Sequence, residues 1–291
     1  MKASSSSSSL PRRWSIYSYR RNVKRYTWGV VFITPMIRRT FRILPATGAM
    51  RERALWKEGV RDWDSFMGCD TVNGMSERRK EKCNAVIMAA QGRHSMGDCR
   101  GLASMLPRSE LWRLYDDFKS KAAFLDIETD GLGPGCEVTV VGVHSRDGTQ
   151  TFVSGEDLDV ASVAQALEGT SVLITFNGSC FDIPVLTAAF PELQLDIPHI
   201  DLRFAARRAG LSGGLKVIER NLGLNRDEGI ADVDGFEAVR LWNAWRRGCA
   251  RSLDTLLEYN RADTENLPFV AEEVCSRLTK MTLGDMDGKV C

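Results

Sequence analysis

Apolar and polar positions divide the chain into a helical part and a mixed part that begins near residue 121. Between residues 51 and 120, apolar side chains recur at roughly every third or fourth position, which predicts amphipathic helices. They include Leu55, Trp56, Val60 and Trp63, and later Leu111, Trp112, Leu114, Tyr115 and Phe118. Pro107 marks the start of the last of these helices. We interpret the aromatic side chains as the core of a small helical module.

From residue 121 the pattern changes to short apolar runs that are separated by turn residues. Strands are predicted over 122–127, 138–144, 150–153 and 171–176, with Asp147-Gly148 as the hairpin turn between the second and third. Helices are predicted over 159–167, 182–190, 201–209, 215–222, 235–247 and 252–278. This order predicts an α/β fold, in which helices flank a mixed sheet of three antiparallel strands plus parallel strands.

The charge of the chain is unevenly distributed. The formal net charge is +1, from 39 Lys and Arg against 38 Asp and Glu. Residues 1–50 contain ten Lys or Arg and no acid, so the remainder has 29 basic and 38 acidic residues and a charge of −9. A negative body argues against a protein that grips nucleic acid through a broad basic surface, and it suits a site that recruits cations.

Residues 1–48 have the composition of a segment outside the fold. They open with six serines and continue with arginines and no acid, so we expect a disordered extension. It could be an organelle transit peptide, a translated upstream stretch before a true start at Met50, or a nucleic-acid-binding arm. The predicted organisation is therefore this extension, a helical module over 49–120, a catalytic domain over 121–280 and a tail over 281–291.

Cysteine and histidine usage bears on metal chemistry and on compartment. The eight cysteines include no C-x-x-C pair and the chain has three histidines, which argues against a zinc or iron-sulfur site. Scattered cysteines are typical of free thiols in a reducing compartment. Since no apolar run is long enough to span a membrane, we expect a soluble cytoplasmic protein without membrane partners, or an organellar one if residues 1–48 are a transit peptide.

The first candidate chemistry lies on the strand at 122–127. The strand period of two places Asp126 and Glu128 on one face and Leu125 and Ile127 on the other. Two carboxylates on an otherwise apolar strand are costly to bury unless cations compensate them, so divalent metal is the natural partner. Taken alone, the pair could also be an acid pair at an exposed strand end.

Two further acids follow in the chain. Asp182 is expected at a helix N-terminus because Pro184 is tolerated in the first helical turn, and it could simply cap that helix. Tyr259 and Asp263 are four positions apart on a helix and share a face. The alternative for this pair is a solvent-facing Asp263 beside a packed tyrosine.

Together the three elements resemble the DEDD superfamily of 3′-to-5′ exonucleases. The shared order is D-x-E on the first strand, N-x-x-x-F-D after the fourth and Y-x-x-x-D near the end. Position 258 is Glu, so the tyrosine variant (DEDDy) is indicated. The match is closest to the YprB-like domain with an RNase H-like fold and covers about residues 121–280. Supporting stretches include Ile200-Asp201-Leu202, Gly214-Leu215-Lys216 and Asn221-Leu222-Gly223.

The resemblance implies a site with two Mg²⁺ or Mn²⁺ ions. Asp126 would bridge the ions, Glu128 and Asp263 would complete the site of the ion that activates water, and Asp182 would hold the second ion. Tyr259 would orient the attacking water. Asn177 and Lys216 are candidate substrate contacts, although Lys216 could be an ordinary solvated helix charge. Asp201 is interpreted as a helix-start acid.

The function implied by the resemblance is a metal-dependent 3′-to-5′ exonuclease that hydrolyses phosphodiester bonds of single-stranded or 3′-ended nucleic acid. DNA and RNA are both open as substrates, and no protein partner is indicated. The alternatives are a catalytically inactive RNase H-like module that binds nucleic acid or a partner, an endonuclease or strand-transfer enzyme on the same fold, and a helical interaction protein built around residues 51–120.

Overall fold

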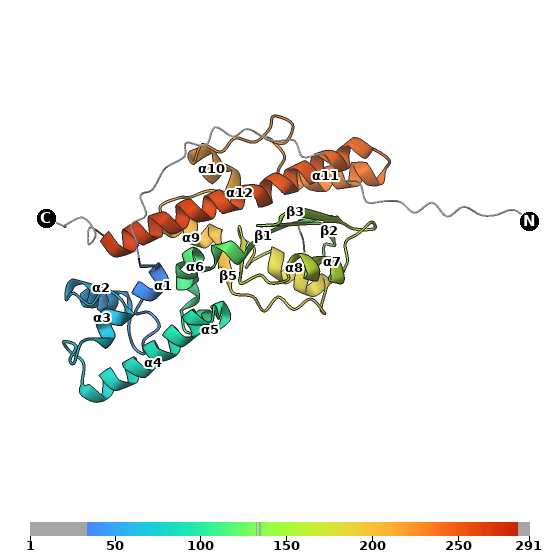
Figure 1. Cartoon of the computed structure of the whole chain (residues 1–291). Coiled ribbons are helices and arrows are strands. Elements are labelled where there is room, and N and C mark those ends of the chain that lie inside the picture. The colour runs from blue at the N-terminus through green and yellow to red at the C-terminus, as the bar shows by residue number, and fades with distance from the viewer. Residues whose placement is uncertain (1–33, 132, 134, 285–291) are drawn as a thin grey trace, which may run out of the picture. The chain divides into compact units, whose positions relative to one another are not determined.

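The structure is a computed structural model that describes residues 34–131, 133 and 135–284 (Figure 1). The serine-rich start of the predicted extension and the end of the predicted tail lie outside the described residues. None of the described helices is both long enough and apolar enough to cross a membrane. The seven described cysteines are free thiols.

A five-stranded mixed sheet forms the centre of the C-terminal part. Its strands are β1 (Ala122–Thr129), β2 (Val138–Ser145), β3 (Gly148–Val153), β4 (Val172–Thr175) and β5 (His199–Asp201), in the order β3-β2-β1-β4-β5. The first three strands pair antiparallel, and β4 and β5 continue the sheet in parallel. The predicted fold class is confirmed. The three residues of β5 were not predicted as a strand, because so short a run carries no alternation.

Helices cover both faces of the sheet, as Figure 1 shows. One face packs against α7 (Val160–Ala166) and α8 (Asp182–Ala189), and α11 (Gly235–Arg246) and α12 (Ala250–Leu283) pack on the other. α9 (Leu202–Arg208) and α10 (Leu215–Asn221) both contact α12.

Alternation along β1 decides which side chains meet which layer of helices. Ala123, Leu125 and Ile127 join the cluster with α7 and α8, whereas Ala122 and Phe124 join the cluster that contains α12. Asp126 and Glu128 continue the second series and therefore point towards α12.

Helices build the region before the sheet, and most of them are short. They are α1 (Met36–Arg39), α2 (Ala49–Lys57), α3 (Trp63–Met67), α4 (Glu77–Ser95), α5 (Cys99–Ser104), η1 (Arg108–Leu114), α6 (Tyr115–Phe118) and η2 (Lys119–Lys121). The helix predicted after Pro107 is thus a 3₁₀ segment followed by one α-helical turn. The hydrophobic core of this region runs on to Phe124 and Ile174 of the sheet, so the two regions share one core.

Residues 34–48, which were expected to belong to a disordered extension, pack into the helical region. Ile37 and Phe41 are completely buried. The indole N–H of Trp56 donates to the carbonyl of Arg39 at 3.0 Å, and that of Trp63 donates to the carbonyl of Thr40 at 2.8 Å. The segment packs because its apolar side chains, which alternate with arginines in the sequence, are buried in the core. The arginines alone suggested an extension.

A buried ion network ties this segment to the rest of the helical region. The Arg113 guanidinium donates to Glu52 at 2.9 Å, to Glu110 at 2.7 Å and to the Thr40 hydroxyl at 2.7 Å. The side chains of Arg113 and Glu52 are 3% and 2% exposed, so each charge depends on the other for compensation.

We expect a Phe41→Ala substitution to lower the free energy of unfolding by about 3–5 kcal/mol, the usual cost of truncating a buried phenylalanine. Urea denaturation measures this loss. The matched control is Phe204→Ala, because Phe204 is 51% exposed and should lose less than about 1 kcal/mol. Equal losses in the two variants would contradict the packing of residues 34–48.

Candidate active site

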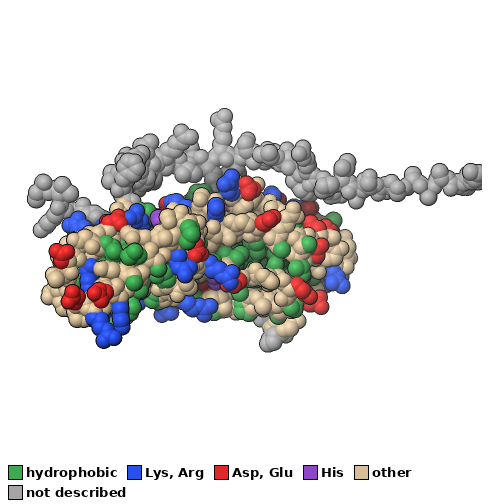
Figure 2. All heavy atoms as spheres, turned by 60° about the horizontal axis from the view of Figure 1, so that its bottom comes forward, with side chains coloured by type: hydrophobic (Ala, Val, Ile, Leu, Met, Phe, Trp, Pro, Cys, Tyr) green, Lys and Arg blue, Asp and Glu red, His purple; other side chains and the backbone are tan. Residues whose placement is uncertain are grey.

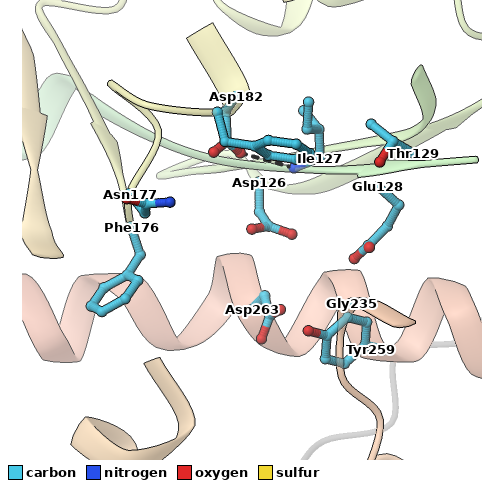
Figure 3. Close-up of a pocket in the computed structure, with 11 residues that line it drawn as sticks. Asp126, Ile127, Glu128, Thr129, Phe176, Asn177, Asp182, Gly235, Tyr259 and Asp263 are labelled. Carbon is cyan, nitrogen blue, oxygen red and sulfur yellow. Dashed lines mark hydrogen bonds between the residues drawn. The ribbon is translucent and has the colours of Figure 1, made fainter. Parts of the chain in front are cut away.

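The acid pair of β1 lies on the face that meets α12, as the alternation predicts. Figure 3 shows Asp126 and Glu128 pointing from β1 towards the helix that carries Tyr259 and Asp263. Glu128 is buried and Asp126 is half-buried. A register shift follows Glu128 in the pairing of β1 with β2, so the regular ladder is interrupted just after the acid pair.

Helix α12 supplies the third acid of a compact group. Tyr259 and Asp263 are one turn apart on its buried side. Asp126, Glu128 and Asp263 each offer one carboxylate oxygen, and these three oxygens lie within 4.8 Å of one another. Only the resemblance predicted that these residues lie close together, because 135 positions separate Glu128 from Asp263 in the sequence.

Asp182 approaches from the opposite layer of helices. It is the first residue of α8, as predicted, but its side chain does not cap the helix. Its Oδ1 accepts from the backbone N–H of Ile127 at 3.2 Å. That N–H is available because β1 pairs with β4 only as far as Phe124. Asp182 lines the same pocket as the other three acids, outside the compact group.

Asn260 and Gly142 support the acid pair, and sequence reasoning gave neither a role. The Asn260 amide donates to the Asp126 carboxylate at 3.0 Å and to the Asp126 carbonyl at 3.2 Å. Gly142 lies opposite Asp126 on β2, and a Cβ there would come within 2.1 Å of Asn260 Oδ1. A glycine is needed at this position because any side chain would displace Asn260. The period-two pattern of β2 contained no signal for this contact.

Arg226 is the second functional side chain that sequence reasoning missed. It lies between α10 and α11, where no periodic pattern predicted an element. Its guanidinium contacts the Asp263 carboxylate and donates to Glu219 at 2.6 and 2.9 Å. The Arg226 and Glu219 side chains are 5% and 1% exposed, so this ion pair is part of the interior of the site.

The two predicted substrate contacts occupy different places. Asn177 lines the carboxylate pocket and has a φ of +72°, and its side chain accepts from Arg203 at 2.7 Å. Lys216 lies over the Tyr259 ring, 5.3 Å from its centroid, and donates to the carbonyls of Ala231 and Val233. It lines a second pocket beside the first.

The helix-start interpretation of Asp201 is confirmed. Its side chain caps α9 by accepting from the backbone N–H of Arg203 at 3.0 Å. It also accepts from the backbone N–H of Asn177 at 2.8 Å and from that of Ser179 at 3.0 Å. Asp201 therefore fixes the turn that presents Asn177 and leads into Asp182.

Burial raises the pKa of all four carboxyl groups, and repulsion from neighbouring carboxylates adds to it. Burial is the largest cause for Asp126 and Glu128, followed by repulsion from Asp263, and both pKa values lie well above the usual range. Burial raises the pKa of Asp182 to about 7, although backbone hydrogen bonds favour its charged form. Burial also raises the pKa of Asp263 to about 6, against the opposing effect of Arg226. Uncompensated negative charge is thus costly here.

The donor set fits a hard divalent cation. Glu128 Oε1 is buried and has no hydrogen-bond donor among the described residues, which is expensive for an acceptor unless another partner satisfies it. The three nearby ligand atoms are carboxylate oxygens, the ligands that Mg²⁺ and Mn²⁺ prefer. A divalent ion at this group would satisfy Glu128 and offset the repulsion that raises the carboxyl pKa values.

Comparison with known proteins gives one family match. Residues 123–275 match the profile of the RNase H superfamily. No curated protein matches the chain.

Several solved structures are similar. They include the family B DNA polymerase of the hyperthermophilic archaeon Pyrobaculum calidifontis, with 16% identity over 58% of this chain and 27% of that chain and a TM-score of 0.44. A structure described as the apo form of the nuclease has 23% identity, covers 57% of this chain and 78% of that chain, and has a TM-score of 0.40. The Aedes aegypti Nibbler EXO domain has 14% identity, with 62% and 91% covered and a TM-score of 0.41. The chain spans about a quarter of the polymerase's length.

The raised pKa values predict that the metal-free protein loses stability as pH rises from about 4 to about 7. Asp182 and Asp263 have pKa values of about 7 and about 6 when folded, against an ordinary value of 3.8. The folded state therefore binds more protons than the unfolded state in this range, and each deprotonation favours unfolding. Urea denaturation in EDTA at several pH values measures the slope.

Asp182→Asn is the matched variant for this test, since an Asn side chain can still accept from Ile127. We expect its stability to fall less steeply with pH than that of the wild type. Identical slopes for the two proteins, or a wild-type stability that rises between pH 5 and 7, would contradict the raised pKa values of the buried carboxyl groups.

Proposed function

The chain belongs to the RNase H superfamily, and we propose that it is a divalent-metal-dependent 3′-to-5′ exonuclease of the tyrosine (DEDDy) type, similar to YprB-like domains. Its fold is RNase H-like, as predicted. The observation that carries the proposal is the group of oxygens from Asp126, Glu128 and Asp263 within 4.8 Å of one another. Family membership alone would not distinguish a nuclease from a module that has lost its site.

Each carboxylate has a part in the proposed reaction. Asp126, Glu128 and Asp263 would hold one ion, and Asp126 with Asp182 would hold a second. Bound divalent ions would supply an activated water and offset charge on the attacking and leaving oxygens at phosphorus. One Asp182 oxygen accepts a hydrogen bond from the backbone N–H of Ile127. Strand β1 therefore fixes the orientation of that carboxylate. Asn260 fixes Asp126 in the same way.

Tyr259 acts as a neutral hydroxyl in this proposal. Burial is the largest cause that raises its pKa far above the usual value, and the charges of Asp263, Glu128 and Asp126 add to it. A phenol that stays protonated at neutral pH cannot be the base that removes a proton from water. It can orient the attacking water through its hydroxyl, which lies in the carboxylate pocket.

The proposed substrate is single-stranded or 3′-ended nucleic acid, with Asn177 and Lys216 as candidate contacts. On the face drawn in Figure 2, basic side chains are interspersed with acidic and apolar ones over the described residues, without a continuous basic surface. Because residues 51–291 carry a net charge of −9, recognition would depend on the site and on local contacts more than on a broad electrostatic footprint. The helical region that precedes the sheet shares its core with the catalytic part, and we propose that it supports that part.

The proposal predicts that the protein shortens 5′-labelled single-stranded DNA or RNA from the 3′ end in Mg²⁺ or Mn²⁺. EDTA should abolish cleavage. Asp126→Asn should slow it at least about 100-fold, because the loss of one ligand removes several kcal/mol of stabilisation from the transition state. Comparison of the two substrates identifies the preferred sugar.

The matched control is Asp147→Asn, a substitution at an exposed hairpin turn whose side chain is 79% exposed; it should leave the rate unchanged. A substrate with a blocked 3′ end separates the exonuclease from an endonuclease, which would still cut it. No cleavage of either nucleic acid by the folded protein would favour the inactive binding module.

We expect Tyr259→Phe to lower kcat by about 10-fold or more while the affinity for Mn²⁺ changes less than about twofold. The lost hydroxyl orients water, and a misplacement of a reacting group by about 1 Å can cost roughly 10²-fold. Single-turnover cleavage and Mn²⁺ titration measure the two quantities. Tyr115→Phe is the control, because Tyr115 is buried outside the pocket. An unchanged rate in Tyr259→Phe would contradict the proposal that Tyr259 orients the attacking water.

A further inference from the structure

Arg226 brings a buried positive charge into the carboxylate site. Its guanidinium contacts Asp263, a member of the group of three proposed metal ligands. Its side chain is 5% exposed, and its centre lies 5.6 Å from the centroid of the Tyr259 ring. Arg226 therefore touches one proposed ligand and packs on the proposed water-orienting residue.

A second carboxylate, Glu219, also holds the guanidinium. Arg226 donates to Glu219 at 2.6 and 2.9 Å, and Glu219 also accepts from the Asn266 amide at 3.0 Å. Asn266 lies on α12, one turn beyond Asp263. Nη2 serves both Asp263 and Glu219, whereas Nε donates to Glu219 alone, so the Nε contact can hold the guanidinium when Nη2 leaves Asp263.

Some polar atoms in and beside the ion pair of Arg226 and Asp263 have no hydrogen-bond partner among the described residues. Within the described part of the chain, Arg226 Nη1 is buried without an acceptor, and Glu128 Oε1 is buried without a donor. Buried polar groups are normally paired, so the unpaired atoms at this ion pair need an explanation, and a further charge entering the site would supply one.

We propose that Arg226 is an internal counter-ion that neutralises Asp263 in the metal-free protein and is displaced from Asp263 when a divalent ion binds. This inference rests on the proposed metal centre. A guanidinium and a divalent cation repel each other, and both are attracted to the same carboxylate. Arg226 is a positioning residue in this account: it stabilises the empty site and lowers the affinity of the site for metal.

The counter-ion account predicts two effects of opposite sign for Arg226→Gln. The variant should melt at a lower temperature in EDTA, because the carboxylates lose a compensating charge. It should bind Mn²⁺ about 5- to 100-fold more tightly, the usual range for two coupled ligands, because the competing cation is gone. A residue that merely supported the fold would weaken both properties when it was replaced.

The experiment is calorimetric titration of Mn²⁺ into the full chain at pH 8, with thermal denaturation in EDTA as the second readout. Arg226→Lys keeps the charge and should bind Mn²⁺ more like the wild type than Arg226→Gln does. Arg220→Gln is the matched control, because Arg220 is exposed and lines the neighbouring pocket. Its affinity and melting temperature should equal those of the wild type.

Unchanged or weaker Mn²⁺ binding by Arg226→Gln, with normal binding by the wild type, would overturn the counter-ion and leave the proposed function intact. Absence of Mn²⁺ binding by the wild type would overturn both. If Arg226→Gln fails to fold, a Mg²⁺ titration of wild-type protein with ¹⁵N-labelled arginine decides the matter. The Arg226 side-chain resonance, assigned by its loss in Arg226→Lys, should shift as the ion binds, and a constant resonance would overturn the proposal.

Discussion

Buried negative charge at the meeting of β1 and α12 is the constraint on which the site depends. Asp126 and Glu128 come from the strand and Asp263 from the helix, and burial raises the pKa of each carboxyl group. Such a group persists only if cations and hydrogen-bond donors offset its cost. Arg226 and Asn260 supply part of that compensation from within the chain. We infer that divalent metal supplies the rest.

The layers of the fold follow from the same arrangement. β1 presents Leu125 and Ile127 to the cluster with α7 and α8, so its polar face is free to meet α12. Early divergence of β4 from β1 leaves the N–H of Ile127 for Asp182. The alternation of one strand and the end of another therefore bring acids from three separate segments to one pocket.

Much of this architecture was predictable because it depends on local periodicity. The strand alternation around Asp126 gave the orientation of the acid pair, and four of the five strands and the major helices of the sheet region were predicted near their observed positions. β5 was missed because three residues carry no pattern. Residues 34–48 were assigned to a disordered extension because their charge resembles one, whereas Ile37 and Phe41 pack in the core.

The supporting residues of the site could not be predicted for a different reason. Arg226, Asn260 and Gly142 act through contacts between segments far apart in the sequence, so no local spacing marks their roles. Asp182 was predicted at a helix start, but its bond to Ile127 depends on where β4 ends. The chemistry of the acidic side chains pointed to them as candidate ligands. The residues that hold these acids in place are known only from the tertiary structure.

The central claim is that Asp126, Glu128 and Asp263 together hold a divalent ion. Crystals soaked in MnCl₂ and measured at a wavelength that excites manganese test it directly through anomalous scattering. The account predicts an anomalous peak coordinated by these three carboxylates, with the Arg226 guanidinium withdrawn from Asp263. A well-diffracting, manganese-soaked crystal with no peak at the three carboxylates, and with Arg226 still paired to Asp263, would contradict it.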